Sequence, residues 1–163
     1  MPRMLVTMAV EIPRGSRNKY EMDPATGLIH LDRMLFTATR YPADYGFVPD
    51  TVAEDGDPLD AMAIVTEPTF PGCRIRIRPV GLFLMEDQGL PDHKVVGVPV
   101  RDPMWGSVTS LDELPAHLLR EFEHFFSVYK DLEDMKTASL GWKGPDEALQ
   151  VLRAAGARLE DEG

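Results

Sequence analysis

Asp55-Gly56-Asp57-Pro58-Leu59-Asp60 is the stretch around which the chain is organised, and a short apolar run, Ala61 to Val65, follows it. Pro58 fixes its own φ angle and has no N–H to donate, whereas Gly56 permits a positive φ. Together they predict a stiff turn that brings three carboxylates into one small volume. Crowded carboxylates repel one another, so we expect raised pKa values or a bound cation there. The apolar run predicts a buried strand directly after the turn.

The acidic turn also has simpler explanations. Asp, Gly and Pro are common in surface turns that bind nothing. An EF-hand loop is excluded, because Leu59 and Asp60 stand where that loop needs an oxygen ligand and a glycine, and Thr66 stands where it needs glutamate. Taken alone, the turn leaves a metal site and an ordinary surface turn equally open.

Length and composition are typical of one globular domain, residues 1–163. Hydrophobic residues make up 44% of the chain and charged residues 27%. No apolar run approaches the ~20 residues of a membrane span, and nothing resembles a signal peptide. The formal charge of −10 argues against a nucleic-acid partner. We therefore expect a cytoplasmic protein with no membrane or nucleic-acid partner.

Alternating apolar residues predict several short strands. They cover residues 6–12, 19–22, 28–35, 61–65, 75–77, 80–85 and 94–100. The stretch from Tyr41 to Phe47 is expected to be an irregular aromatic loop packed on the core. Arg74, Arg76 and Arg78 are expected to form an exposed or interface face.

Two helices are predicted late in the chain. Ser110 and Glu113 form a capping-box pattern, and Pro115 follows just inside the expected start. An apolar stripe at helical spacing then predicts a helix packed on the sheet; it consists of Leu118, Phe122, Phe125, Phe126 and Tyr129. A second helix is expected after Gly144-Pro145. Many strands followed by two helices indicate an α+β fold with a closed or nearly closed antiparallel β-barrel.

Polar residues occur in a characteristic order within these structured stretches. The order is Glu11, Lys19, Glu21, Arg33, Tyr41, Tyr45, Asp55, Asp57, Asp60, Asp87, Asp92, Lys94, Tyr129 and Lys130. From about residue 6 to 142 the chain resembles family I soluble inorganic pyrophosphatase of the bacterial type. The acidic turn matches that family's signature, Asp-small-Asp-Pro-hydrophobic-Asp. Further matching motifs are Glu11-Ile12-Pro13, Lys19-Tyr20-Glu21, Asp32-Arg33, Tyr41-Pro42, Tyr45-Gly46, Arg78-Pro79-Val80-Gly81 and Tyr129-Lys130-Asp131-Leu132-Glu133.

The resemblance implies an OB-like barrel of about five strands with two flanking helices, assembled as a homohexamer. It also implies Mg²⁺-dependent hydrolysis of pyrophosphate to two orthophosphates, with Mn²⁺ or Zn²⁺ as possible substitutes for Mg²⁺. Pyrophosphate offers little to recognise except its oxygens, so metal ions and basic side chains suit it chemically.

Residue roles carried over by position are also expectations from this resemblance. Asp57 would be the general base for in-line attack by a water that bridges two metal ions. The metal ligands would be Asp55, Asp60, Asp87, Asp92 and Glu21. The substrate-binding residues would be Lys19, Arg33, Tyr45, Lys94, Tyr129 and Lys130, with Glu11 and Tyr41 in supporting positions.

Three local features depart from the family pattern. Glu86 adds an acid beside Asp87, and His93 separates Asp92 from Lys94. We interpret both as solvent-facing variants. The stretch 137–140 looks one residue short and lacks a lysine that is often found there.

Two alternatives to a pyrophosphatase remain. One is a broader phosphohydrolase that acts on nucleotides or polyphosphate, which the absence of a Gly-rich phosphate loop disfavours. The other is a non-catalytic cation-binding module with an OB-like barrel. Such a module would use the acids but would have no need of Lys19, Arg33, Lys94 and Lys130.

Overall fold

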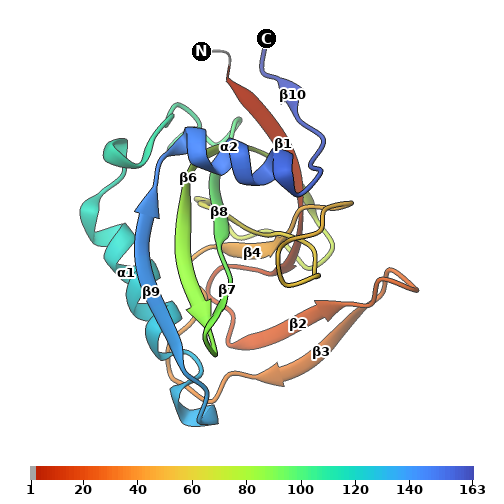
Figure 1. Ribbon diagram of the computed structural model, residues 1–163, viewed down its shortest axis with the longest axis vertical. Coiled ribbons are helices and arrows are strands. Elements are labelled where there is room, and N and C mark those ends of the chain that lie inside the picture. The colour runs from red at the N-terminus through yellow and green to blue at the C-terminus, as the bar shows by residue number, and fades with distance from the viewer. Residues whose placement is uncertain (1–2) are drawn as a thin grey trace.

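The computed structural model describes residues 3–163 (Figure 1). Strands dominate the first two thirds of the chain, and the helices come later. In chain order the elements are β1 Met4–Ile12, β2 Asn18–Met22, β3 Ile29–Met34, β4 Asp44–Phe47, β5 Asp60–Ala63, β6 Arg74–Asp87, β7 Leu90–Pro91, β8 Lys94–Pro99, the 3₁₀ turn η1 Leu111–Glu113, α1 Ala116–Val128, η2 Asp131–Glu133, β9 Thr137–Lys143, α2 Pro145–Ala154 and β10 Glu160–Asp161.

Five strands close into a barrel. The hydrogen-bonded ring runs β1–β4–β5–β8–β6, and β6 pairs with β1 again. Closure removes the exposed edges that an open sheet of these short strands would have. The expected α+β, OB-like five-stranded barrel with two helices is therefore confirmed, although one pair in the ring, β5–β8, is parallel. The strands β2 and β3 form a separate two-stranded hairpin beside the barrel (Figure 1).

The long strand β6 holds the barrel together because it pairs with several partners along its length. Its first residues pair with β1, its middle with β8 and its last residues with β9. The sequence suggested two separate apolar runs interrupted at Pro79. Instead, the ladder with β8 shifts register between Pro79 and Gly81, so the strand passes through the proline as one bent element.

The expected loop from Tyr41 to Phe47 is wrong in its second half, because Asp44–Phe47 forms β4 and pairs with both β1 and β5. A Cβ atom at Gly46 would lie 1.9 Å from the backbone oxygen of Ala9, so only glycine allows β1 to approach this closely. Asp44 is fully buried; its carboxylate accepts hydrogen bonds from Arg14 N (2.8 Å), Thr69 N (3.0 Å) and Thr69 Oγ1 (2.6 Å).

Both predicted helices are present at the expected positions, but one of the predicted capping interactions is not. Helix α2 begins at Pro145 after Gly144, as expected. Helix α1 begins at Ala116 with Pro115 as its N-cap, and η1 precedes it. The Ser110–Glu113 capping box is wrong, because Ser110 precedes η1 instead of α1 and its side chain makes no cap hydrogen bond, while the Glu113 carboxylate accepts from the backbone and hydroxyl of Thr109. The 3₁₀ turn redirects the chain before the helix starts.

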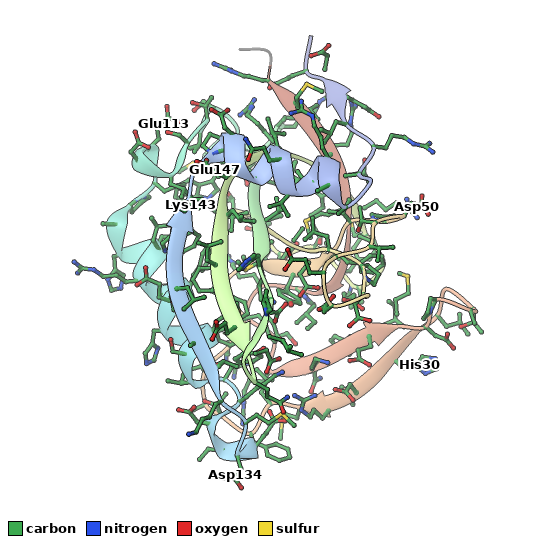
Figure 2. All side chains as sticks on the ribbon, viewed as in Figure 1. His30, Asp50, Glu113, Asp134, Lys143 and Glu147 are labelled. Atoms are coloured by element: carbon green, nitrogen blue, oxygen red, sulfur yellow. The ribbon has the colours of Figure 1, made fainter. Side chains whose placement is uncertain are left out.

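The sheet buries apolar side chains on two sides, and each helix covers one cluster. The aromatic stripe of α1, including Phe122 and Phe126, packs with Phe83 and Val96. Leu152 of α2 packs in the other cluster. Helix α2 crosses one end of the barrel over β6 and β8 (Figure 1), and side chains fill the inside of the ring (Figure 2). Strands β9 and β10, which the sequence did not predict, pair with β6 and β1.

The three arginines of β6 do not share one environment. Arg74 and Arg76 are exposed, as expected. The same expectation is wrong for Arg78, which is only 5% exposed. Its Nη1 donates to the backbone oxygens of Gly106 (2.6 Å) and Val108 (2.8 Å), and its Nε donates to Glu162 (2.8 Å). Arg78 therefore ties the carboxyl-terminal segment and the 106–108 loop to the barrel.

We expect Arg78→Met to lower the free energy of unfolding by at least about 2 kcal/mol, because the buried Val108 carbonyl, the partly buried Gly106 carbonyl and the Glu162 carboxylate lose their donor. Arg76→Met is the matched control, since its exposed ion pair with Glu160 is expected to contribute less than about 1 kcal/mol. Urea unfolding of both variants measures the difference. Equal losses would show that the buried guanidinium is no more important than the exposed one.

Candidate active site

Most of the residues singled out from the sequence come from four segments that meet near one end of the barrel (Figure 1). These segments are the β2–β3 hairpin, the acidic turn that leads into β5, the β6–β7–β8 connection and the end of α1 with η2. The other residues are Glu11 in β1, Tyr41 just before β4 and Tyr45 in β4. Strand pairing brings them together: Asp60 begins β5, Lys94 begins β8, and the two residues are direct partners in the parallel β5–β8 ladder.

A buried lysine lies at the centre of the site. Lys94 is completely buried, and its Nζ donates to Tyr45 Oη (2.8 Å), Asp60 Oδ2 (2.9 Å) and Asp92 Oδ2 (3.1 Å). The Tyr45 hydroxyl also donates to Asp60 Oδ2 (2.9 Å). Four residues predicted as metal ligands or substrate ligands thus form one hydrogen-bonded cluster.

Burial and neighbouring charges shift the pKa values in this cluster. Burial is the largest cause that raises the pKa of Asp92; Lys94 lowers it and Asp60 raises it, and together these effects bring it to about 6. Burial opposes the charged form of Lys94, but Asp60 and Asp92 together raise the pKa of its ammonium. Burial also raises the pKa of Tyr45, Tyr41 and Tyr129, so their hydroxyls stay protonated and can donate hydrogen bonds.

A second charged pair lies beside this cluster. Lys130 Nζ forms an ion pair with Asp87 Oδ2 and lies 5.4 Å from the centre of the Tyr129 ring. The other carboxylate oxygen, Asp87 Oδ1, is buried and has no hydrogen-bond partner within residues 3–163. A buried carboxylate oxygen without a donor is unfavourable unless a cation or another donor reaches it.

The hairpin supplies a third group of charges. Lys19 pairs with Glu21 and, at 3.2 Å, with Asp32, while Arg33 Nε lies 2.7 Å from Glu133 Oε1. Glu11 Oε2 accepts from the backbone N–H of Met22 (2.9 Å), which joins β1 to the hairpin. Burial raises the pKa of Glu11, and the Met22 hydrogen bond partly offsets that shift.

The acidic turn itself is held by hydrogen bonds of its own backbone, and its residues 54–58 are exposed. Gly56 has φ +87°, as the sequence predicted, and Ala53 N donates to Asp57 O (2.7 Å) across the turn. Asp55 Oδ1 accepts from the backbone N–H of Asp57 (3.0 Å). Within the described residues, the Asp57 carboxylate accepts no hydrogen bond and forms no ion pair. It is therefore available to bind a proton or water.

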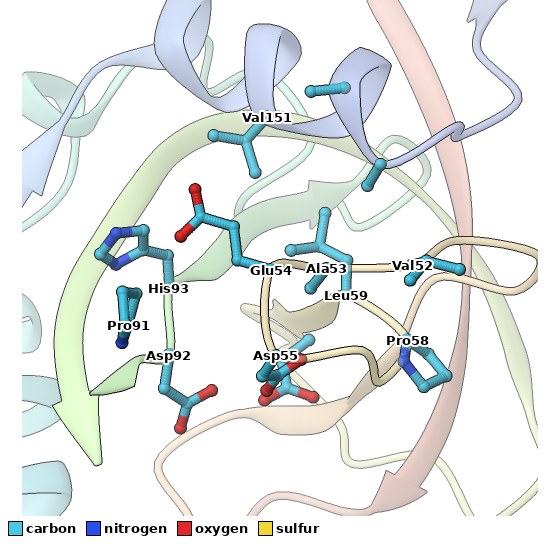
Figure 3. A pocket seen from close by; sticks show the side chains of 13 residues that line it. Val52, Ala53, Glu54, Asp55, Pro58, Leu59, Pro91, Asp92, His93 and Val151 are labelled. Carbon is cyan, nitrogen blue, oxygen red and sulfur yellow. The ribbon is translucent and has the colours of Figure 1, made fainter. Parts of the chain in front are cut away.

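A cavity of about 150 Å³ opens between this turn and α2 (Figure 3). Asp55, Asp60 and Asp92 lie at its acidic end, and Glu54 and His93 also line it. His93 is thus half-buried in the cavity wall, which corrects the expectation that it faces solvent; Glu86 is half-buried as well. The stretch 137–140 forms the first half of β9.

The chemistry of these side chains fits a hard divalent cation. All predicted metal ligands are carboxylates, which such cations prefer, and Asp87 Oδ1 lacks a donor. In the part of the chain that the structure describes, no three Asp, Glu, His or Cys side chains already lie close enough together to hold one ion. The acids are distributed around the site, and Lys94 occupies the space between Asp60 and Asp92.

Sequence reasoning assigned no role to three acids that the structure places in or near the site. Asp32 and Glu133 hold Lys19 and Arg33, and Asp44 anchors the start of β4 beside Tyr45. Asp32 directly precedes Arg33, and Glu133 closes the Tyr129–Glu133 motif, so membership of these two motifs was an available signal. For Asp44 the only signal was a charged residue in an otherwise aromatic stretch. Tyr41 is buried in an aromatic cluster with Tyr45 and Phe125.

We expect Asp92→Asn to become more stable relative to the wild type as the pH rises from about 4 to about 6, with both proteins treated with EDTA. A carboxyl whose folded-state pKa is raised binds more protons in the folded state, so the wild type loses stability across this range. The shift from 3.8 to about 6 sets an upper limit of about 3 kcal/mol, at about 1.4 kcal/mol per pKa unit. Urea unfolding at pH 4, 5, 6 and 7 tests this, and a difference that does not change with pH would contradict it.

The fold and the site together define a class of protein. A closed OB-like barrel that gathers carboxylates, basic side chains and protonated tyrosines at one end is an enzyme architecture suited to a small, highly charged phosphate substrate. Within that class the chain belongs to the inorganic pyrophosphatase family, because the family model for inorganic pyrophosphatase matches residues 8–160. Membership implies a divalent metal cofactor in general.

Relatives and solved structures agree with this assignment. The inorganic pyrophosphatase of Methanosarcina acetivorans is 49% identical over 96% of this chain and 93% of its own length. That of Geobacillus stearothermophilus is 46% identical over 97% and 96%. The crystal structure of the Thermus thermophilus inorganic pyrophosphatase superposes with a TM-score of 0.89 at 44% identity, covering 93% of this chain and 88% of that one. The Helicobacter pylori enzyme gives 0.90 at 37% identity, covering 93% and 91%. No helix within residues 3–163 is long and apolar enough to cross a membrane.

Proposed function

We propose that this chain hydrolyses inorganic pyrophosphate to two orthophosphates with Mg²⁺ as its cofactor. The observation that carries the proposal is the interleaving of acids and bases at one end of the barrel, centred on Lys94 between Asp60 and Asp92. The relatives named as inorganic pyrophosphatases support the substrate. A cation-binding module would not need the basic residues, so the enzyme is the better explanation.

The basic side chains would bind the two phosphoryl groups. Lys19, Arg33 and Lys130 are each held by a carboxylate and are only partly buried, so they can turn toward an anion at small cost. Arginine binds two phosphate oxygens at once, whereas lysine provides a point charge. Tyr45 and Tyr129 keep their protons and would donate hydrogen bonds without adding charge. Lys94 would bind phosphate and hold the carboxylates of Asp60 and Asp92 in position.

The metal would be held by Asp55, Asp60, Asp87 and Asp92, with Glu21 at the hairpin as a further ligand. When bound, a divalent ion neutralises phosphate oxygens and lowers the pKa of water near it. An all-oxygen ligand set suits Mg²⁺, with Mn²⁺ or Zn²⁺ as possible substitutes. The unpartnered Asp87 Oδ1 supports a cation at that position.

Asp57 would act as the general base for in-line attack of water on one phosphorus atom. Its carboxylate projects from a turn that its own backbone holds rigid, and it is not committed to any ion pair within residues 3–163. It can therefore accept a proton from water without first breaking another contact. Glu11 and Tyr41 would hold the hairpin and the aromatic wall in place.

Three wider expectations complete the proposal. The whole chain, residues 1–163, would form one pyrophosphatase domain, which the match over residues 8–160 supports. The assembly would be a homohexamer in the cytoplasm, by analogy with bacterial members of the family. Sedimentation of the purified protein measures the assembly directly.

Phosphate release from pyrophosphate tests the central proposal. We expect rapid release with Mg²⁺, none with EDTA, and recovery when Mg²⁺ is added back. ATP and polyphosphate serve as competing substrates, and faster release from either would favour a broader phosphohydrolase. A protein that binds Mg²⁺ but releases no phosphate with Mg²⁺, Mn²⁺ or Zn²⁺ would be a binding module instead.

A further inference from the structure

The cavity between α2 and the acidic turn has two chemically different ends (Figure 3). One end is apolar and is formed by Val151 and Ala154 of α2, by Ala155 just after the helix and by Val52 of the facing loop. The other end is acidic and is formed by Asp55, Asp60 and Asp92, while Glu54 lies between the two ends beside His93. The proposed hydrolysis uses only the acidic end, so the apolar end has no role in it.

A backbone hydrogen bond connects the two walls of the cavity. Val52 N donates to Ala155 O (3.0 Å), which ties the loop to the end of α2. The side chain of Val52 is nevertheless 63% exposed, although it is a large apolar residue. An apolar cavity of this size, about 150 Å³, can hold a molecule of about the size of benzene.

The charged residues of the cavity wall indicate the charge of a ligand that could bind there. Four carboxylates line the cavity, and no lysine or arginine of residues 3–163 is among the lining residues, although Lys94 pairs with two of the four, Asp60 and Asp92. Glu54 and Asp55 form no ion pair within those residues. These two unpaired carboxylates therefore favour a cation over a free anion in the part of the cavity that they line. A bare metal ion would use the acids but would leave the apolar wall in contact with water.

We propose that this cavity binds a primary organic ammonium with a small apolar body, its ammonium among the acids and its body against α2. Burial of the apolar body adds hydrophobic affinity that a simple ammonium lacks. Benzylammonium is the probe, because its ring matches the size of the cavity. Such a ligand would also compete with the metal for Asp55, Asp60 and Asp92. That consequence rests on the proposed function, whereas the binding itself does not.

Binding to EDTA-treated protein at pH 8, measured by calorimetry or ligand-observed NMR, tests the two halves of the ligand separately. We expect benzylammonium to bind at least about tenfold more tightly than methylammonium, which lacks the ring, and than benzyl alcohol, which lacks the charge. Benzoate, the anionic counterpart, is expected not to bind. Equal affinity for benzylammonium and either of its first two analogues would overturn the proposal.

Substitutions outside the proposed catalytic residues test whether benzylammonium binds in this cavity. Val151→Phe fills the apolar end and is expected to weaken benzylammonium binding at least about tenfold, whereas Gln150→Phe, one position along α2 and outside the cavity, is expected to leave it unchanged. Glu54→Gln is expected to weaken benzylammonium binding but not benzyl alcohol binding. If Val151→Phe does not fold, Ala154→Leu at an exposed position replaces it. Unchanged binding in a folded cavity-filling variant would refute the site.

Inhibition is a separate measurement. We expect benzylammonium to raise the Mg²⁺ concentration needed for half-maximal phosphate release, and Val151→Phe to abolish that effect with little change in basal activity. If the protein releases no phosphate, the proposed function fails, but the binding measurements still decide whether the ammonium site exists. If phosphate release is normal and the ammonium does not bind, only the present inference fails.

Discussion

Asp57→Asn is expected to lower the turnover number for pyrophosphate by about 10²–10⁴-fold, the usual contribution of a general base. Asparagine has nearly the same shape as aspartate but cannot accept the proton of the attacking water. The backbone of the turn, including the contact from Asp57 N to Asp55 Oδ1, does not depend on the side chain that is changed. Metal binding and folding should therefore be retained.

The measurement is steady-state phosphate release at saturating pyrophosphate and Mg²⁺, with Mg²⁺ binding followed by calorimetry. Asp146→Asn, an exposed acid in the first turn of α2, is the matched control and should retain wild-type turnover. Near-normal turnover in Asp57→Asn would remove Asp57 as the base. Loss of both turnover and Mg²⁺ binding would instead make it a metal ligand.

Lys94→Met is expected to lower the free energy of unfolding of the EDTA-treated protein by about 3–5 kcal/mol, the usual effect of removing one partner from a buried ion pair. Lys94 is completely buried, and its removal leaves Asp60 and Asp92 close together without a cation. Methionine has a similar length, so little of the loss would come from packing.

Urea unfolding with EDTA and with Mg²⁺ separates two explanations of this loss. If the proposed metal ligands are correct, Mg²⁺ supplies charge to the same carboxylates, and the loss should be smaller in its presence. Lys143→Met, at the exposed end of β9 (Figure 2), is the control and should change stability by no more than about 0.5 kcal/mol. A loss in Lys94→Met no larger than in this control would show that the buried ammonium does not stabilise the fold.

Local sequence patterns predicted much of the molecule because they reflect local physical constraints. Strict alternation predicted β1, and Gly56 with Pro58 predicted the turn with its positive φ. The aromatic stripe predicted α1, and Gly144-Pro145 predicted the start of α2. In each case the residue types restrict the backbone or require one buried face, whatever the rest of the chain does. The proposed site roles came instead from resemblance to the family and stay predictions.

Other features depend on partners that are distant in sequence. The aromatic stretch around Asp44–Phe47 became a strand only because β1 and β5 lie on both sides of it. Arg78 was expected on the surface, yet Glu162 and two loop carbonyls 28 and 30 residues away bury it. The alternation does not distinguish Arg78 from Arg76, since both continue the same pattern of arginine and isoleucine from Arg74 onward.

The sequence by itself determined which chemical groups this protein carries, namely the acidic turn and the ordered set of basic residues and tyrosines. It also determined that two helices follow many strands. Only the tertiary structure decided how those groups meet. The parallel pairing of β5 with β8 puts Lys94 beside Asp60 as well as Asp92, and α2 crosses the barrel to make the cavity beside them. The reason is physical: residue type and spacing set local conformation, whereas burial, ion pairing and pKa depend on which distant segments pack together.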